Sequence, residues 1–169
     1  MSGRSNIFAI MKTLTLKIIK VNVYNEVAKT TSYTGAKKLD DESAYDRIFT
    51  TDADRLMLER FWNEACGMAN DTLKPFLVKT SDNAPGHCMD LSLDYDVTLS
   101  MPQRFDDGLR PAIESDLFSF FTNYIVSKWY GFTAKDEVPA YSAEAATSLK
   151  SFKKKIYFKK RPERPSTNL

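Results

Sequence analysis

Three long stretches of the chain carry apolar side chains at helical spacing, and they constrain the fold more than any other feature. Residues 51–74, 109–130 and 135–157 place hydrophobic side chains three or four positions apart. A helix with that spacing has an apolar face that must be buried against a partner. Thr51 is placed to cap the first helix and Gly131 to end the second. The sequence therefore predicts three main helices packed around a common core.

Two further stretches alternate between apolar and polar residues, which is typical of half-buried β-strands. Residues 13–20 place Leu14, Leu16 and Ile18 on one side, and residues 89–101 show the same alternation. The backbone of a strand needs a hydrogen-bonding partner, so we expect the two to pair. The predicted fold class is α+β, with three main helices packed against a small, mostly antiparallel β-sheet and with extended N- and C-terminal arms.

Residues 21–33 are compatible with two structures. Val23, Val27 and Thr31 lie four apart, which favours a short helix ended by Gly35. The threonines, serine and tyrosine at the end of this stretch also suit a strand. We favour the helix, followed by a polar loop.

The chain divides into an N-terminal arm or extension at 1–11, a single globular domain at 12–160 and an extended tail at 161–169. The core is expected to include Leu58, Phe61, Trp62, Leu93, Val97, Leu117, Phe121, Tyr124, Tyr141, Leu149 and Phe152. The aromatic residues left for interfaces are Tyr130, Phe132, Tyr157 and Phe158.

Charge is strongly segregated along the chain, although the net charge is only +2. Residues 150–164 hold eight basic and one acidic side chain, while the rest holds 16 basic and 21 acidic ones. The basic stretch has three interpretations: a solvated helix end, a site that docks on an acidic protein surface such as a second copy, or a nucleic-acid contact. The candidate contact residues are Lys153, Lys154, Lys155, Lys159, Lys160, Arg161, Arg164, Tyr157 and Phe158.

The sequence offers little for catalysis or for a cofactor. His87 and Cys88 are adjacent, so on a strand their side chains would point to opposite faces. That geometry is poor both for nucleophilic catalysis and for metal binding. Asp90, Asp94 and Asp96 are best explained as the solvated face of the second strand. We therefore predict no catalytic residue, no cofactor and no metal site. The two cysteines are too few for a disulfide framework and suggest a reducing compartment, and no apolar run is long enough for a membrane span.

The order of these features resembles a known group of proteins. The residues that carry the resemblance are Tyr33-Thr-Gly35, Tyr45-Asp-Arg-Ile-Phe-Thr-Thr-Asp-Ala-Asp54, Tyr124-Ile-Val-Ser-Lys-Trp129, Tyr141, Leu149 and Lys159-Lys-Arg-Pro162. They resemble hypothetical proteins of Bacteroidales phages and prophages and, more distantly over residues 33–162, the head–tail connector (adaptor) proteins of tailed bacteriophages.

That resemblance implies a non-enzymatic virion protein, assembled in the bacterial host cytoplasm, that forms a ring at the neck between portal and tail. Its partners would be other copies of itself, the portal and tail proteins and, transiently, phage DNA, with no membrane. Two alternatives stay open. A tail-completion (terminator) protein has a similar size and more sheet, and a nucleic-acid-binding module would use the basic C-terminal helix.

Overall fold

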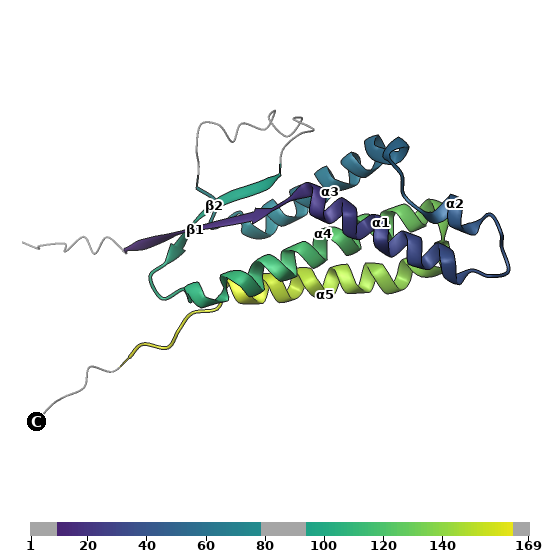
Figure 1. Cartoon of the computed structure of the whole chain (residues 1–169). Helices are drawn as coiled ribbons and strands as arrows, with labels where there is room; N and C mark the ends of the chain where they lie inside the picture. The colour runs from purple at the N-terminus through teal and green to yellow at the C-terminus, as the bar shows by residue number, and fades with distance from the viewer. Residues whose placement is uncertain (1–9, 79–93, 164–169) are drawn as a thin grey trace, which may run out of the picture.

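The computed structural model describes residues 10–78 and 94–163, which form an elongated helical bundle with a small sheet at one end (Figure 1). In chain order the elements are β1 (Met11–Ile18), α1 (Lys20–Lys37), α2 (Ala44–Ile48), α3 (Arg55–Leu73), β2 (Tyr95–Pro102), α4 (Arg110–Thr133) and α5 (Val138–Ile156). Short 3-10 turns precede the last three helices: η1 (Asp52–Asp54), η2 (Asp107–Leu109) and η3 (Lys135–Glu137). The predicted mixture of helix and strand is confirmed, and the described chain is mostly helical.

Helix α4 lies at the centre of the bundle, because apolar residues occupy nearly all of its sides. It packs against α1, α3, α5 and the sheet strand β1. Its buried side chains are Ile113, Leu117, Phe120, Phe121, Thr122, Ile125, Val126, Trp129 and Tyr130. Tyr130 is fully buried and donates a hydrogen bond of 2.7 Å to Thr34 Oγ1 of α1, so its predicted role at an interface is wrong. Gly131 lies inside α4 and does not end it.

The two strands pair antiparallel, as predicted, with Leu14 opposite Leu99. Leu14, Leu16 and Ile18 are buried on the face that contacts the helices. The second strand is shorter than expected within the described chain, since β2 begins at Tyr95, and residues 89–93 lie outside the described part. Its other edge is bridged by the segment after α3 at Leu77.

The bundle has four long helices, one more than the three main ones predicted. The additional one is α1, which confirms the favoured helix over 21–33 and extends beyond it to Lys37. Gly35 was expected to end this helix, but it lies within it. A Cβ atom at Gly35 would come within 2.9 Å of the Tyr45 Cα atom, so glycine is required here by the close approach of α2. The short helix α2 was not predicted.

Most of the expected core is buried. The fully or nearly fully buried members are Leu58, Phe61, Trp62, Leu117, Phe121 and Phe152. Val97, Tyr124, Tyr141 and Leu149 are partly buried against the same cluster, and Leu93 lies outside the described residues. Phe132, Tyr157 and Phe158 are exposed, as expected of interface candidates. The terminal residues 1–9 and 164–169 of the expected arms are outside the described chain, and 161–163 form neither helix nor strand.

The two glycines give a matched test of this packing. We expect Gly35→Ala to lower the free energy of unfolding by about 1–3 kcal/mol, because the new methyl group meets the backbone of Tyr45. Gly131→Ala should instead raise it by up to about 1 kcal/mol, since the site is helical and nothing lies within 4 Å. Urea denaturation of both variants measures the difference, and equal effects would contradict the assigned role of Gly35.

Candidate functional site

The basic C-terminal end consists of the last turns of α5 and the segment that follows it. Lysines in the last turn of a helix interact favourably with its carbonyl end, and α5 has Lys153, Lys154 and Lys155 there. Beyond the helix, the chain runs beside the β2–α4 connection, where Lys159 bridges Phe105. This places the basic residues at the end of the bundle that also holds the sheet (Figure 1).

Two of the predicted contact residues are structural ties rather than free surface charges. Lys155 Nζ pairs with Asp116 of α4 and donates to Ser151 Oγ at 2.9 Å, so it holds α5 against α4. Lys160 Nζ lies 3.2 Å from Asp106 Oδ1. A backbone hydrogen bond from Gly108, followed by the Lys160 ammonium, lowers the pKa of the Asp106 carboxyl. Both lysines thus have a structural role within the subunit, and their contact with a partner stays a prediction.

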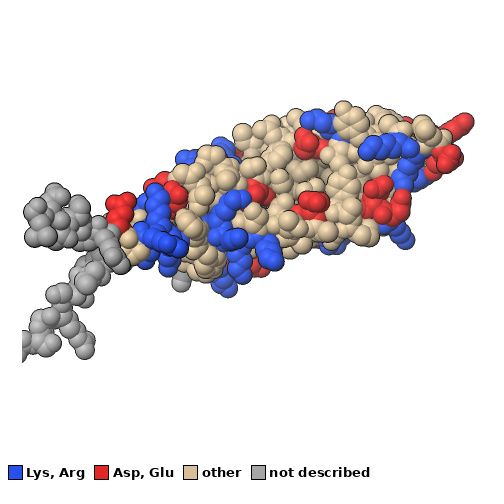
Figure 2. Space-filling view, turned by 90° about the horizontal axis from the view of Figure 1, so that it is seen from below, with Lys and Arg blue, Asp and Glu red and all other residues tan. Residues whose placement is uncertain are grey.

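The remaining described members of the predicted set face solvent. Lys153, Lys154, Lys159 and Arg161 are exposed and have no ion pair within residues 10–78 and 94–163. Tyr157 and Phe158 are 45% and 50% exposed, and Phe158 lines a hollow of about 280 Å³ with Lys154. Arg164 lies outside the described residues. Figure 2 shows several basic side chains together at this end of the body.

The opposite end of the bundle is rich in acidic side chains. It is formed by the connection between α1 and α2 and by the turn between α4 and α5 (Figure 1). Asp41 pairs with Arg47 at 2.9 Å, and Asp136 pairs with Lys38 at 2.6 Å. Asp40, Glu42, Asp46 and Glu144 are exposed, and none of them has an ion pair in the described part of the chain. Lys37 and Lys135 lie at the same end and are also exposed without an ion pair in the described chain, so negative charge is in excess there but not alone. The elongated body thus carries an excess of unpaired positive charge at one end and an excess of unpaired negative charge at the other.

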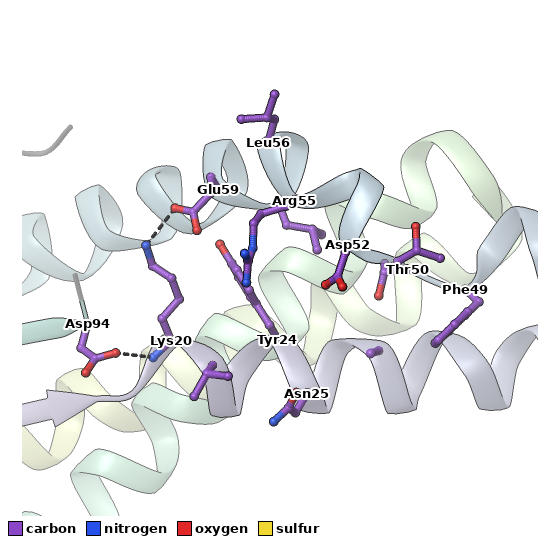
Figure 3. Close-up of a pocket in the computed structure, with 14 residues that line it drawn as sticks. Lys20, Tyr24, Asn25, Phe49, Thr50, Asp52, Arg55, Leu56, Glu59 and Asp94 are labelled. Atoms are coloured by element: carbon purple, nitrogen blue, oxygen red, sulfur yellow. Dashed lines mark hydrogen bonds and ion pairs between the residues drawn. The ribbon is translucent and has the colours of Figure 1, made fainter. Parts of the chain in front are cut away.

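A groove of about 960 Å³ separates α1 from the beginning of α3 (Figure 3). One end is closed by a buried ion pair in which Lys20 Nζ lies 2.8 Å from Glu59 Oε2. The backbone N–H of Lys20 donates to Asp94 Oδ1 at 2.9 Å, so Asp94 satisfies a donor at the start of α1. Asp94 was expected on a solvated strand face together with Asp96, which alone is exposed there. Asp94 is partly exposed, so the expectation of a solvated carboxylate holds only in part, because one of its oxygens accepts from the start of α1.

The buried charged pair in the groove helps to hold the fold together. The Lys20 ammonium lies 5.4 Å from the centre of the Trp62 ring as well as beside Glu59, a favourable position for a cation. Burial, followed by the nearby Glu59 carboxylate, raises the pKa of the Tyr24 hydroxyl well above its usual range. The groove therefore joins the β1–α1 corner to α3, and this contact had no signal in the sequence because the partners are far apart along the chain.

Other expectations about chemistry are only partly covered by the structure. His87, Cys88 and Asp90 lie outside the described residues. Within the described ranges, no group of three or more His, Cys, Asp or Glu side chains is placed to hold a metal ion. Among the helices described, none is both long and apolar enough to cross a membrane.

Comparisons of the chain with protein-family models, with curated proteins and with solved structures give no match in any of the three. Three surfaces of the molecule remain as the places where a partner could bind. These are the basic end with its exposed aromatic residues, the acidic end, and the groove closed by Lys20 and Glu59.

The buried ion pair yields a second prediction. Lys20→Met should lower the free energy of unfolding by about 3–5 kcal/mol, because it leaves Glu59 buried without its partner. The double variant Lys20→Met/Glu59→Leu should recover most of that loss. Lys29→Met, which removes an exposed pair with Glu26, is the matched control and should cost less than about 1 kcal/mol. Chemical denaturation of the four proteins measures these values, and equal losses for Lys20→Met and Lys29→Met would refute the structural role of the groove pair.

Proposed function

We propose that this chain is a non-enzymatic structural subunit of a tailed-phage virion, a head–tail connector whose copies form a ring between portal and tail. The observation that carries the proposal is the separation of unpaired charge. Lys153 and Lys154 lie at one end of the elongated body, and Asp40 and Glu42 lie at the other. A contact between two different surfaces of identical subunits generates a ring when the rotation between them closes.

The rest of the surface is consistent with an assembly role. Phe132, Tyr157 and Phe158 are large aromatic side chains exposed outside the core, and such residues are enriched where proteins contact one another. In the groove, the buried ammonium of Lys20 is paired with the Glu59 carboxylate. These features support a protein whose charges serve contacts within and between subunits.

The secondary structure favours the connector over a tail-completion protein. The described chain is mostly helical and has one sheet of two strands. A tail-completion protein of this size is expected to have more sheet. In the connector, the ring as a whole would meet the portal and tail proteins and, transiently, the DNA that passes through the neck, and the particle would be assembled in the cytoplasm of the bacterial host.

The proposal predicts a charge-dependent ring. Size-exclusion chromatography with light scattering should give a defined multiple of the monomer mass for the natural protein. Lys153→Glu/Lys154→Glu should shift it toward the monomer, because it reverses the charge that attracts the acidic end of a neighbour. Lys29→Glu/Arg60→Glu changes the net charge equally at exposed sites of α1 and α3 whose ion pairs lie within their own helices, and it should leave the ring intact.

Mixing complementary variants makes the same test sharper. Asp40→Lys/Glu42→Lys alone should also lose the ring, and mixing it with Lys153→Glu/Lys154→Glu should restore contacts between unlike subunits. A natural protein that is monomeric at every concentration, or a ring unaffected by both end variants but sensitive to the control, would overturn the proposed contact.

A second candidate function is nucleic-acid binding, favoured by Tyr157 and Phe158 exposed beside unpaired basic residues. Fluorescence anisotropy with single-stranded DNA should then show an affinity that falls linearly with salt on logarithmic axes. Replacing Lys153, Lys154, Lys159 and Arg161 by glutamine should abolish that binding and flatten the salt dependence. Affinity unchanged by these substitutions, which leave the ties through Lys155 and Lys160 in place, would exclude this function.

A further inference from the structure

Within residues 10–78 and 94–163, strand β1 pairs with β2 on one edge and with no strand on its outer edge, and the direction of its backbone groups follows from the pairing of β2. Val78 N–H donates to the Thr98 carbonyl at 3.1 Å, and Ser100 N–H donates to the Phe76 carbonyl at 2.7 Å. In an antiparallel ladder, the N–H and C=O of one residue point to the same side, and successive residues alternate. Thr98 and Ser100 therefore face the segment after α3, and the residues between them face β1.

The register then fixes which residues of β1 point outward. Leu14 lies opposite Leu99 and Leu16 opposite Val97, so these residues bond to β2. The backbone groups of Met11, Thr13 and Thr15 consequently point away from the sheet, as do those of Lys17. Lys17 N–H reaches Glu114 Oε1 of α4 at 3.4 Å, which agrees with this assignment and closes the edge at that end.

The outward groups of Met11, Thr13 and Thr15 have no hydrogen-bond partner among residues 10–78 and 94–163. An open strand edge of this kind accepts another strand, and proteins usually block it with a bulge, a proline or an unpaired charge. β1 contains no bulge and no proline. The ammonium of Lys12 does not protect the edge as an unpaired charge, because it forms an ion pair with Asp107 at 2.8 Å. The edge is thus unprotected over these three positions.

We propose that the β1 edge binds the β1 edge of a second copy of this chain, antiparallel and centred on Thr13. The open stretch is symmetric about that residue. In this register Thr13 pairs with Thr13 of the second copy, and Met11 pairs with Thr15, so each open position meets another open position. The two sheets would join into one continuous four-stranded sheet.

The side chains along the edge suit pairing with an identical strand. Ile10 is 73% exposed although it shares the core-facing side of the strand with Leu14 and Leu16. The proposed register places Ile10 opposite Leu16 of the second copy, which extends the apolar face across the joint. Lys12 lies opposite a leucine in this register, so no two lysines face each other. The pairing also covers Met11, which is 52% exposed.

This inference goes beyond the proposed function, because the strand contact differs from the contact between oppositely charged ends. The strand contact uses the same surface on both copies, so it closes as a pair. It would join two subunits, or two rings face to face. Its failure would leave the ring contact untouched, and the reverse also holds.

Thr13→Pro tests the pairing directly. Proline removes an N–H group that the fold of one subunit does not use, and proline is tolerated at the outer side of an edge strand. Both hydrogen bonds of the central Thr13 pair are lost, so the dissociation constant measured by analytical ultracentrifugation should rise at least about tenfold. Thr13→Ala keeps the N–H group and is the matched control, which should pair like the natural protein. Lys153→Glu/Lys154→Glu should leave the strand contact unchanged.

Residue-resolved amide hydrogen exchange of the natural protein provides a readout that does not depend on the proline variant folding. The Leu14 and Leu16 amides should be protected at every concentration, while the Thr13 and Thr15 amides should become protected only as subunits pair. A protein without a paired species, a Thr13→Pro variant that pairs as tightly as Thr13→Ala, or Thr13 and Thr15 amides protected independently of concentration would each overturn the proposal.

Discussion

The burial of α4 on nearly all sides is the constraint on which the rest of the molecule depends. A helix that is apolar around its circumference needs neighbours on each side, and α1, α3, α5 and β1 supply them. Specific contacts fix each neighbour. The Trp62 and Phe121 rings lie 4.6 Å apart at α3, Tyr130 bonds to Thr34 at α1, and Asp116 pairs with Lys155 at α5. The positions of α1, α3, α5 and β1 therefore follow from the need to bury the apolar surface of α4.

The surroundings of α4 also explain where charge is placed. Its long sides are covered by other elements, and exposed basic groups without an ion pair among the described residues gather at the end of α5, as Lys153 and Lys154 do. Because α1 and α3 both rest on α4, a groove remains between them, and the Lys20–Glu59 pair ties its walls together. The two ends of the molecule therefore suit contacts between subunits through charged side chains. The edge of β1 suits contacts through backbone hydrogen bonds.

The sequence predicted those parts of the fold that depend on local spacing. The long helices α3, α4 and α5 and the pairing of β1 with β2 follow from periodicity and from the need to satisfy a strand. Gly35 and Gly131 misled the prediction, because a glycine at a close approach of two helices and a glycine at an exposed position within a helix both look like a helix end in the sequence. The contacts of Asp94, Lys155 and Lys160 within the subunit had no signal in the sequence for another reason: their partners lie far away along the chain, and only folding brings the groups together.

The reciprocal hydrogen bonds between Lys160 and Arg104 have a mechanical consequence. Its N–H donates to the Arg104 carbonyl at 2.9 Å, and the Arg104 guanidinium returns a bond of 2.8 Å from Nε to the Lys160 carbonyl. A pull on the chain beyond this point would thus be borne by the β2–α4 connection and passed into the central helix, rather than unwinding the last turn of α5. These hydrogen bonds fix the position of the chain at Lys160 on the body, and so set where residues 161–163 leave it at the basic end.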